Sequence, residues 1–144
     1  IKWAERGEKE RVWICNPGHP ISKGLGEYFE IEMTEMYGEP FQVPDPDETV
    51  FISWFEGGEV FRSGLCYKRG NGKIFYFRPG HEAYPVYHNE YVQKAISNAI
   101  YWLNKGENAG TWDDSFNPKD TMERKEPIEP IEVKGYQVDH TYQK

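Results

Sequence analysis

The chain has 144 residues, 16% of them aromatic, and a formal net charge of −7, which suits one acidic domain around one core. The negative charge argues against a nucleic-acid partner, because the phosphate backbone requires a basic surface. The sequence has no apolar stretch of membrane-spanning length and its start, IKWAERGEKE, is not a signal peptide, so we expect a cytoplasmic protein without a membrane partner.

The N-terminal segment predicts a single short strand. Residues 1–11 are charged and show no period, whereas residues 12–15 are apolar and end at Asn16-Pro17-Gly18. This strand includes Cys15, and the second of the chain's two cysteines, Cys66, stands far from it in sequence. Because both cysteines lie among apolar residues and have no metal-ligand spacing, we expect them to be small buried hydrophobic residues.

The next segment predicts an edge strand followed by a loop. Residues 28–33 alternate with period two, which is typical of a half-buried strand near the edge of a sheet. The buried face of this strand is expected to carry Phe29, Ile31 and Met33. The following segment, 37–48, contains three prolines and several acids and is expected to be a loop.

Three runs in the middle of the chain predict consecutive antiparallel strands. Residues 49–55 are β-branched and aromatic without alternation, which suits a strand buried on both faces. Gly57-Gly58 connects this run to the second, 59–67, and the turn at 69–72 connects the second to the third, 73–78. Glycines and Asn-Gly between apolar runs are hairpin signals, so we expect an antiparallel excursion here.

The helix after Asn89 is the clearest predicted element. Asn89 is a suitable N-cap, Glu90 stands at the positive end of the helix dipole, and Gly106 follows where a helix commonly ends. Apolar residues recur at helical spacing and predict one buried stripe. The stripe comprises Val92, Ala95, Ile96, Ala99, Ile100 and Leu103.

One helix is too few for the number of strands. A sheet buried on both faces needs helices on both sides, whereas the chain offers four or five strands and one convincing helix. We therefore expect the second half of a larger α/β domain. The incomplete sheet and the aromatic residues scattered through the tail 109–144 favour a homo-oligomer, and we expect this tail to pack on the domain or on a neighbouring subunit.

Candidate functional residues gather after the last predicted strand. The stretch FYFRPGHEAYPVYH (75–88) begins as a buried strand, breaks at Pro79-Gly80 and presents His81 and Glu82 before the helix. In an open α/β sheet, ligands bind beyond the carboxyl ends of the strands. We therefore expect His81 and Glu82 to be catalytic, as a general acid/base and its partner, or to bind a ligand or a metal. The alternative is a loop histidine beside a solvated acid.

Four further residues are candidates for substrate binding, and each has a structural alternative. Glu56 and Glu59 flank a glycine pair after a buried strand, where a charged hairpin tip is the common alternative. Arg78 is expected to bind a carboxylate or to hold Glu82 or Glu56 in place. Tyr84 is expected to stack on a ring of the ligand or to pack beside the site.

A divalent metal is also a candidate at this site. Histidine ligands suit zinc, and a catalytic zinc requires three protein ligands and an open position. The candidate ligands are His81 and His19, although His19 follows Pro17-Gly18 and has turn capping as its alternative. The sequence has no phosphate-binding G-x-G-x-x-G or Walker loop, so a nucleotide cofactor is not indicated.

Four unusual strings occur in one order along the chain. They are NPGHPISKGL at 16–25, EMYGEPF at 35–41, FISWFEGGEVFRSG at 51–64 and KIFYFRPGHEAYPVYHNEYVQ at 73–93. In these strings the chain resembles the ThuA-like (trehalose utilisation) family, whose fold is related to the class I glutamine amidotransferases. The resemblance implies an α/β, flavodoxin-like three-layer sandwich, with residues 1–108 as the C-terminal part of the ThuA-like domain.

The resemblance also implies a function. In class I amidotransferases a cysteine nucleophile works with a histidine and a glutamate near the last core strand, and His81 and Glu82 are similar to that pair. Neither Cys15 nor Cys66 lies in a G-x-C-x-G-like elbow, so glutamine hydrolysis is the least favoured activity. We expect a protein of trehalose or disaccharide catabolism that binds or transforms a sugar. The alternative is a non-catalytic sugar-binding or regulatory module.

Overall fold

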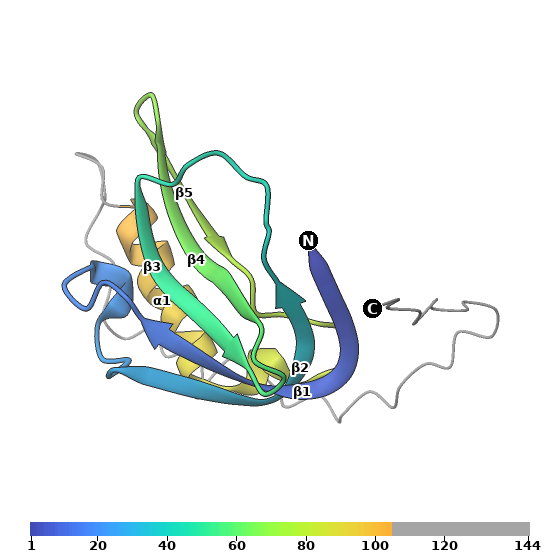
Figure 1. The fold of residues 1–144 in the computed structure, drawn as a ribbon. Helices are drawn as coiled ribbons and strands as arrows, with labels where there is room; N and C mark the ends of the chain where they lie inside the picture. The colour runs from blue at the N-terminus through green and yellow to red at the C-terminus, as the bar shows by residue number, and fades with distance from the viewer. Residues whose placement is uncertain (105–144) are drawn as a thin grey trace.

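The computed structural model describes residues 1–104, which form one five-stranded sheet and one long helix (Figure 1). The strands are β1 (Lys2–Ile14), β2 (Tyr28–Gly38), β3 (Glu48–Phe55), β4 (Val60–Arg69) and β5 (Gly72–Phe77). The helices are α1 (Glu90–Asn104) and two short 3-10 helices, η1 (Pro20–Ser22) and η2 (Val86–His88). The predicted tail 109–144 and the predicted helix end at Gly106 lie outside the described residues.

All neighbouring strands pair antiparallel, in the order β2-β1-β3-β4-β5. The predicted antiparallel excursion is confirmed, and β2 is an edge strand as predicted. Within residues 1–104 the arrangement is a curled, antiparallel sheet with α1 packed on one side, rather than three layers (Figure 1). No parallel strand pair occurs in this part of the chain, so it forms no crevice at the carboxyl ends of parallel strands.

The curl of the sheet begins in β1, which is much longer than predicted. Residues 2–8 pair with β2 alone and are mostly exposed, so their side chains carry no burial pattern that the sequence could reveal. The register between β1 and β2 shifts between Ala4 and Glu8, where Gly7 has a φ of 67°. A bulge of this kind bends a strand and increases its twist.

A second register shift changes the buried face of β2. Glu10 of β1 pairs with Ile31 of β2, and the next pair joins Glu8 to Thr34. Between these two pairs β1 contributes two residues and β2 contributes three. One extra residue moves the side chains that follow to the other face of the strand. Ile31 is therefore buried as predicted, but Met33 is 52% exposed and Thr34 is buried in its place.

Two clusters of buried apolar side chains hold the sheet. The smaller joins the bent parts of β1 and β2 to β3 and β4, and consists of Ala4, Met36, Phe55 and Phe61. The larger lies between α1 and the sheet. Its members are Val12, Ile21, Leu25, Phe29, Ile31, Val50, Phe51, Cys66, Val86, Val92, Ala95, Ala99 and Trp102. Cys66 is thus buried as predicted, whereas the prediction for Cys15 is wrong because Cys15 is exposed in the loop after β1.

Helix α1 begins as predicted, and Val92, Ala95 and Ala99 of the predicted stripe are buried. Asn89 Oδ1 accepts hydrogen bonds from the backbone N–H groups of Tyr91 (3.0 Å) and Val92 (3.2 Å), which confirms the N-cap. The buried residues of the helix are Val92, Ala95, Ala99 and Trp102. Ile100 and Leu103 are 54% and 40% exposed, so their prediction as core residues is wrong. No helix within residues 1–104 is long and apolar enough to cross a membrane.

Candidate functional site

The chain crosses the molecule between β5 and α1. β5 lies at one edge of the sheet, yet Arg78, the next residue, binds side chains of β1 and β2. Its Nη1 lies 2.5 Å from Glu10 Oε2, and its Nη2 donates to Thr34 Oγ1 at 3.2 Å and to the carbonyl oxygen of Glu35. This anchor brings the segment with His81 to the bent parts of β1 and β2.

The anchor is a fully buried ion pair. The side chains of Arg78 and Glu10 are both 0% exposed, and the hydroxyl of Ser53 donates to the Glu10 carboxylate. The guanidinium carbon lies 4.8 Å from the ring centre of Tyr37 and 5.2 Å from that of Phe55. Burial raises the pKa of Glu10, and the guanidinium and the Ser53 hydroxyl oppose that rise. Arg78 therefore holds a carboxylate in place, but that carboxylate is Glu10 and not Glu82 or Glu56 as predicted.

His81 lies among three carboxylates. Its Nε2 is 3.8 Å from Glu35 Oε2 and 3.9 Å from both Glu5 Oε1 and Glu82 Oε2. The side chains of His81 and Glu35 are 9% and 13% exposed, whereas that of Glu82 is 91% exposed. Glu35 is thus the inner carboxylate of the site and Glu82 the outermost.

The hydrogen bonds of His81 fix which ring nitrogen carries the proton. Nδ1 accepts a hydrogen bond from the backbone N–H of Ala83 at 3.0 Å, so in the neutral imidazole the proton is on Nε2. The distances from Nε2 to the carboxylates exceed the length of a direct hydrogen bond, roughly 2.7–3.2 Å. The site therefore offers one donor, the N–H at Nε2 of His81, and three carboxylates as acceptors. A hydroxyl group of a ligand can accept a hydrogen bond from this donor and donate one to a carboxylate.

Two tyrosines pack beside this group. The ring of Tyr84 lies 5.0 Å from that of His81, and its hydroxyl accepts a hydrogen bond from the backbone N–H of Gly7 at the bulge of β1. Burial, followed by the hydrogen bond with Glu35, raises the pKa of Tyr37 to about 12. The phenol of Tyr37 therefore stays protonated at neutral pH and donates to Glu35.

The two predicted glutamates of the β3–β4 turn, Glu56 and Glu59, lie beside β1 and not beside His81. Burial, and then the negative charge of Glu59, raise the pKa of Glu8. Glu8 Oε2 and Glu59 Oε2 are buried without a hydrogen-bond partner among residues 1–104. Glu56 is exposed, and its backbone N–H donates to the carbonyl of Lys9. No contact in this part of the chain joins Glu56 or Glu59 to His81.

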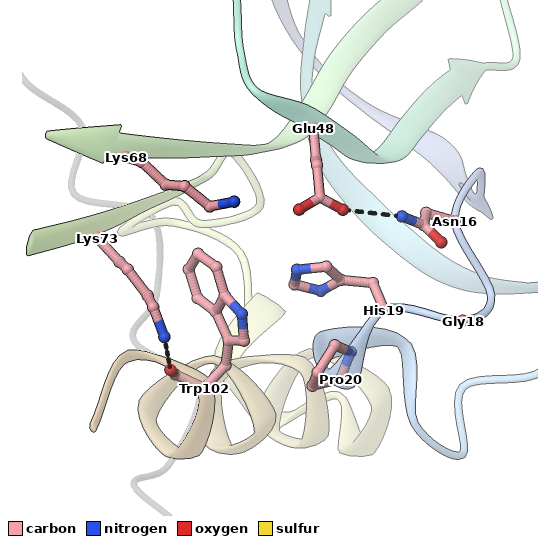
Figure 2. Close-up of a pocket in the computed structure, with 8 residues that line it drawn as sticks. All are labelled: Asn16, Gly18, His19, Pro20, Glu48, Lys68, Lys73 and Trp102. Carbon is pink, nitrogen blue, oxygen red and sulfur yellow. Dashed lines mark hydrogen bonds between the residues drawn. The ribbon is translucent and has the colours of Figure 1, made fainter. Parts of the chain in front are cut away.

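His19 lies in a separate, open pocket of about 560 Å³ beside the last turn of α1 (Figure 2). Its Nδ1 accepts a hydrogen bond from the backbone N–H of Ile21 at 3.2 Å, so His19 caps η1. The ring of His19 lies 5.1 Å from that of Trp102. The pocket is lined by Asn16, Gly18, His19, Pro20, Glu48, Lys68, Lys73 and Trp102.

The two predicted metal ligands have different neighbours. His81 contacts acids of β1 and β2, whereas His19 contacts Cys66 and Trp102. Within residues 1–104 no three His, Cys, Asp or Glu side chains are grouped to hold a metal ion. A metal on His81 Nε2 would also require the proton on Nδ1, which faces the N–H of Ala83. Zinc bound by His81 and His19 stays a prediction.

Sequence reasoning missed two acids of the site. Glu5 lies in the segment that was expected to be unpatterned, and the loop was expected to begin only two residues after Glu35. The one available signal was the position of Glu35 within EMYGEPF, a string that supported the resemblance. The pocket around His19 had no signal beyond His19 itself.

Comparison with known proteins gives a family match. A family model described as ThuA, trehalose utilisation, matches residues 2–103, which include nearly all of the described strands and helices. No curated protein matches the chain.

Proposed function

Because the chain belongs to the ThuA family of trehalose utilisation, we propose that it acts in disaccharide catabolism by binding a sugar at His81 and the surrounding carboxylates. The observation that carries this proposal is the 3.8–3.9 Å spacing between His81 Nε2 and the three carboxylates. A sugar hydroxyl between them accepts from Nε2–H and donates to a carboxylate. A pyranose, which presents hydroxyls on adjacent carbons, fits several acceptors around one donor.

The proposed chemistry is proton transfer at a sugar hydroxyl or beside the carbonyl of an oxidised sugar. Glu35 is the inner carboxylate and receives a hydrogen bond from Tyr37, so we assign it as general base. His81 donates from Nε2 to the oxygen on which negative charge develops. Glu82, predicted to be catalytic with His81, is exposed and reaches the ligand from the open side. Tyr84 packs against His81 and supplies a ring beside the sugar.

The test uses the full chain with trehalose and with a disaccharide in which one hydroxyl is oxidised to a ketone, and follows binding by calorimetry and conversion by NMR. We expect His81→Ala to abolish conversion, and Glu35→Gln to lower kcat by about 10²–10⁴-fold while binding changes little. The matched control is Glu32→Gln, because Glu32 is 79% exposed on the same strand. Unchanged binding and conversion in His81→Ala would overturn the proposal.

The openness of the site favours a second candidate function, a non-catalytic sugar-binding or regulatory module. Glu5 and Glu82 are 41% and 91% exposed, so two of the three carboxylates are open to water, whereas a catalytic site usually excludes water. This function predicts sugar binding without conversion, and full binding in Glu82→Gln. Conversion of the bound sugar would exclude it.

We also propose that residues 1–104 belong to a larger, cytoplasmic, flavodoxin-like three-layer domain that self-associates. Side chains alternate across a strand, so Trp13 faces away from Val12 and from α1. Trp13 and Trp54 are each 40% exposed on that uncovered face, and Ile100 is 54% exposed on α1. Further layers or a second copy of the chain would bury these side chains.

A further inference from the structure

We propose that the pocket around His19 binds a small hydroxylated monoanion, a sugar acid. This binding is independent of His81 and its three carboxylates, Glu5, Glu35 and Glu82 (the His81 cluster). Its volume of about 560 Å³ lies within the range of small-molecule sites, roughly 300–1,000 Å³. Its walls come from the loop after β1, from the start of β3, from β4 and β5, and from α1 (Figure 2). No member of the His81 cluster lines it.

Two lysines give the pocket its positive charge. Lys68 of β4 and Lys73 of β5 are direct cross-strand partners, and like charges in that position destabilise a sheet. The ion pairs of residues 1–104 include neither lysine. Lys73 Nζ donates to the carbonyl oxygen of Trp102 at 3.2 Å, which leaves two of its N–H groups for other acceptors. A bound anion would relieve the repulsion between the two ammonium groups.

The opposite wall supplies partners for hydroxyl groups. Asn16 Nδ2 donates to Glu48 Oε2 at 3.1 Å, which leaves Glu48 Oε1 and the amide oxygen of Asn16 as acceptors (Figure 2). The rings of His19 and Trp102, tilted by 57°, form an aromatic corner beside these groups. An aromatic wall, acceptors and ammonium groups together fit a ligand with C–H faces, hydroxyls and one anionic group.

The charge balance favours a carboxylate over a phosphate. Lys68, Lys73 and Glu48 sum to +1 when His19 is neutral, and burial lowers the pKa of His19. The helix end at the pocket is the C-terminal end of α1, whose partial charge is negative, whereas phosphate sites commonly use a helix N-terminus. A phosphate carries about −1.5 to −2 at neutral pH, which exceeds the charge of the pocket.

Calorimetry on the full chain tests this proposal with four probes: gluconate, glucose, acetate and glucose 6-phosphate. We expect gluconate to bind about tenfold more tightly than each of the others, because it alone combines hydroxyls with a single negative charge. Lys68→Gln should weaken gluconate binding about tenfold. Lys68 is exposed, so its substitution spares the fold. The matched control, Lys2→Gln, removes a lysine of β1 that does not line the pocket.

Two further variants sharpen the test. Glu48→Gln raises the net charge of the pocket from +1 to +2, so it should shift the preference from gluconate toward glucose 6-phosphate. His81→Ala should leave gluconate binding unchanged, which separates this proposal from the proposed function. The proposal is overturned if gluconate does not bind, if glucose or glucose 6-phosphate binds as tightly, if Lys68→Gln behaves like Lys2→Gln, or if His81→Ala abolishes binding.

Discussion

A single buried side chain, Arg78, sets the path of the segment that carries His81. Removal of its charge would leave the Glu10 carboxylate buried with the Ser53 hydroxyl as its remaining polar partner. Breaking one partner of a buried pair typically costs about 3–5 kcal/mol of folding free energy, because the other charge stays buried and unpaired. We therefore expect Arg78→Leu to lower the free energy of unfolding by about that amount in urea denaturation.

An exposed pair provides the control for Arg78. Arg11 Nη2 lies 2.6 Å from Glu30 Oε1, but both side chains are partly exposed, so Arg11→Gln should cost much less folding free energy than Arg78→Leu. The double variant Arg78→Leu/Glu10→Leu should recover much of the loss, because no charge is then left buried. Equal costs for Arg78→Leu and Arg11→Gln would show that the buried pair contributes nothing particular to stability.

The two cysteines differ in exposure, and this difference predicts their reactivity. Burial raises the pKa of the Cys66 thiol to about 12, so Cys66 forms almost no reactive thiolate at pH 8. Burial also raises the pKa of Cys15, but this thiol is exposed and should react faster as the pH rises from 7 to 9. A chromogenic thiol reagent should therefore label one cysteine of the native protein and both in urea. Cys15→Ser should remove the native labelling, and its persistence would contradict the assignment.

His19 predicts a pH dependence of stability. Burial lowers its pKa below the value of roughly 6.5 expected in the unfolded chain. The negative charge of Glu48 raises this pKa, and the positive charge of Lys73 lowers it. The folded state thus binds fewer protons, and the stability that the neutral ring contributes is lost as the pH falls below the unfolded pKa. His19→Asn keeps an acceptor for the N–H of Ile21 and removes the titration. The stability difference between the two proteins should shift in favour of the variant from pH 7.5 to pH 5, and parallel curves would rule out this role.

At the scale of elements, the contact between β3 and β4 depends on a glycine. A Cβ added at Gly64 would lie 2.5 Å from Cδ2 and 2.8 Å from Cβ of Phe51, which is fully buried. A side-chain Cβ cannot move without its backbone, so Gly64→Ala should cost roughly 1–3 kcal/mol through overpacking. The control is Gly57→Ala, where the added Cβ meets only the flexible carboxylate end of Glu59. Thermal unfolding that shows equal losses for the two variants would contradict this account.

Elements with local signals could be predicted from the sequence, and elements set by distant pairing could not. The two glycine turns of the β3–β5 meander and the cap at Asn89 each depend on residues that are adjacent in the chain. The burial of Thr34 instead of Met33 depends on a bulge opposite β1. That bulge is a property of two strands, and neither strand's own alternation reveals it.

At the scale of the whole molecule, the same distinction applies to the candidate site. His81 could be found because it follows a strand and a Pro-Gly break in one continuous stretch. Its partners Glu5 and Glu35 come from the bent parts of β1 and β2, which meet it only because Arg78 crosses to Glu10. The antiparallel order of the sheet was likewise visible only where hairpins connect consecutive strands.

The strand order predicts how the sheet opens. β3 pairs on both sides, with β1 and β4, and holds the fully buried Val50, Phe51 and Phe55, whereas residues 2–8 pair with β2 alone. Amide hydrogen exchange of the full chain should therefore be slowest in β3 and much faster in residues 2–8, since local opening is easiest where few contacts must break. Equal protection in the two segments would contradict this order.

The same measurement distinguishes two modes of self-association. Association through the uncovered face of the sheet would bury side chains and leave the exchange of the edge-strand amides unchanged. Protection of β2 or β5 that increases with protein concentration would instead indicate that the edge strands of two copies pair.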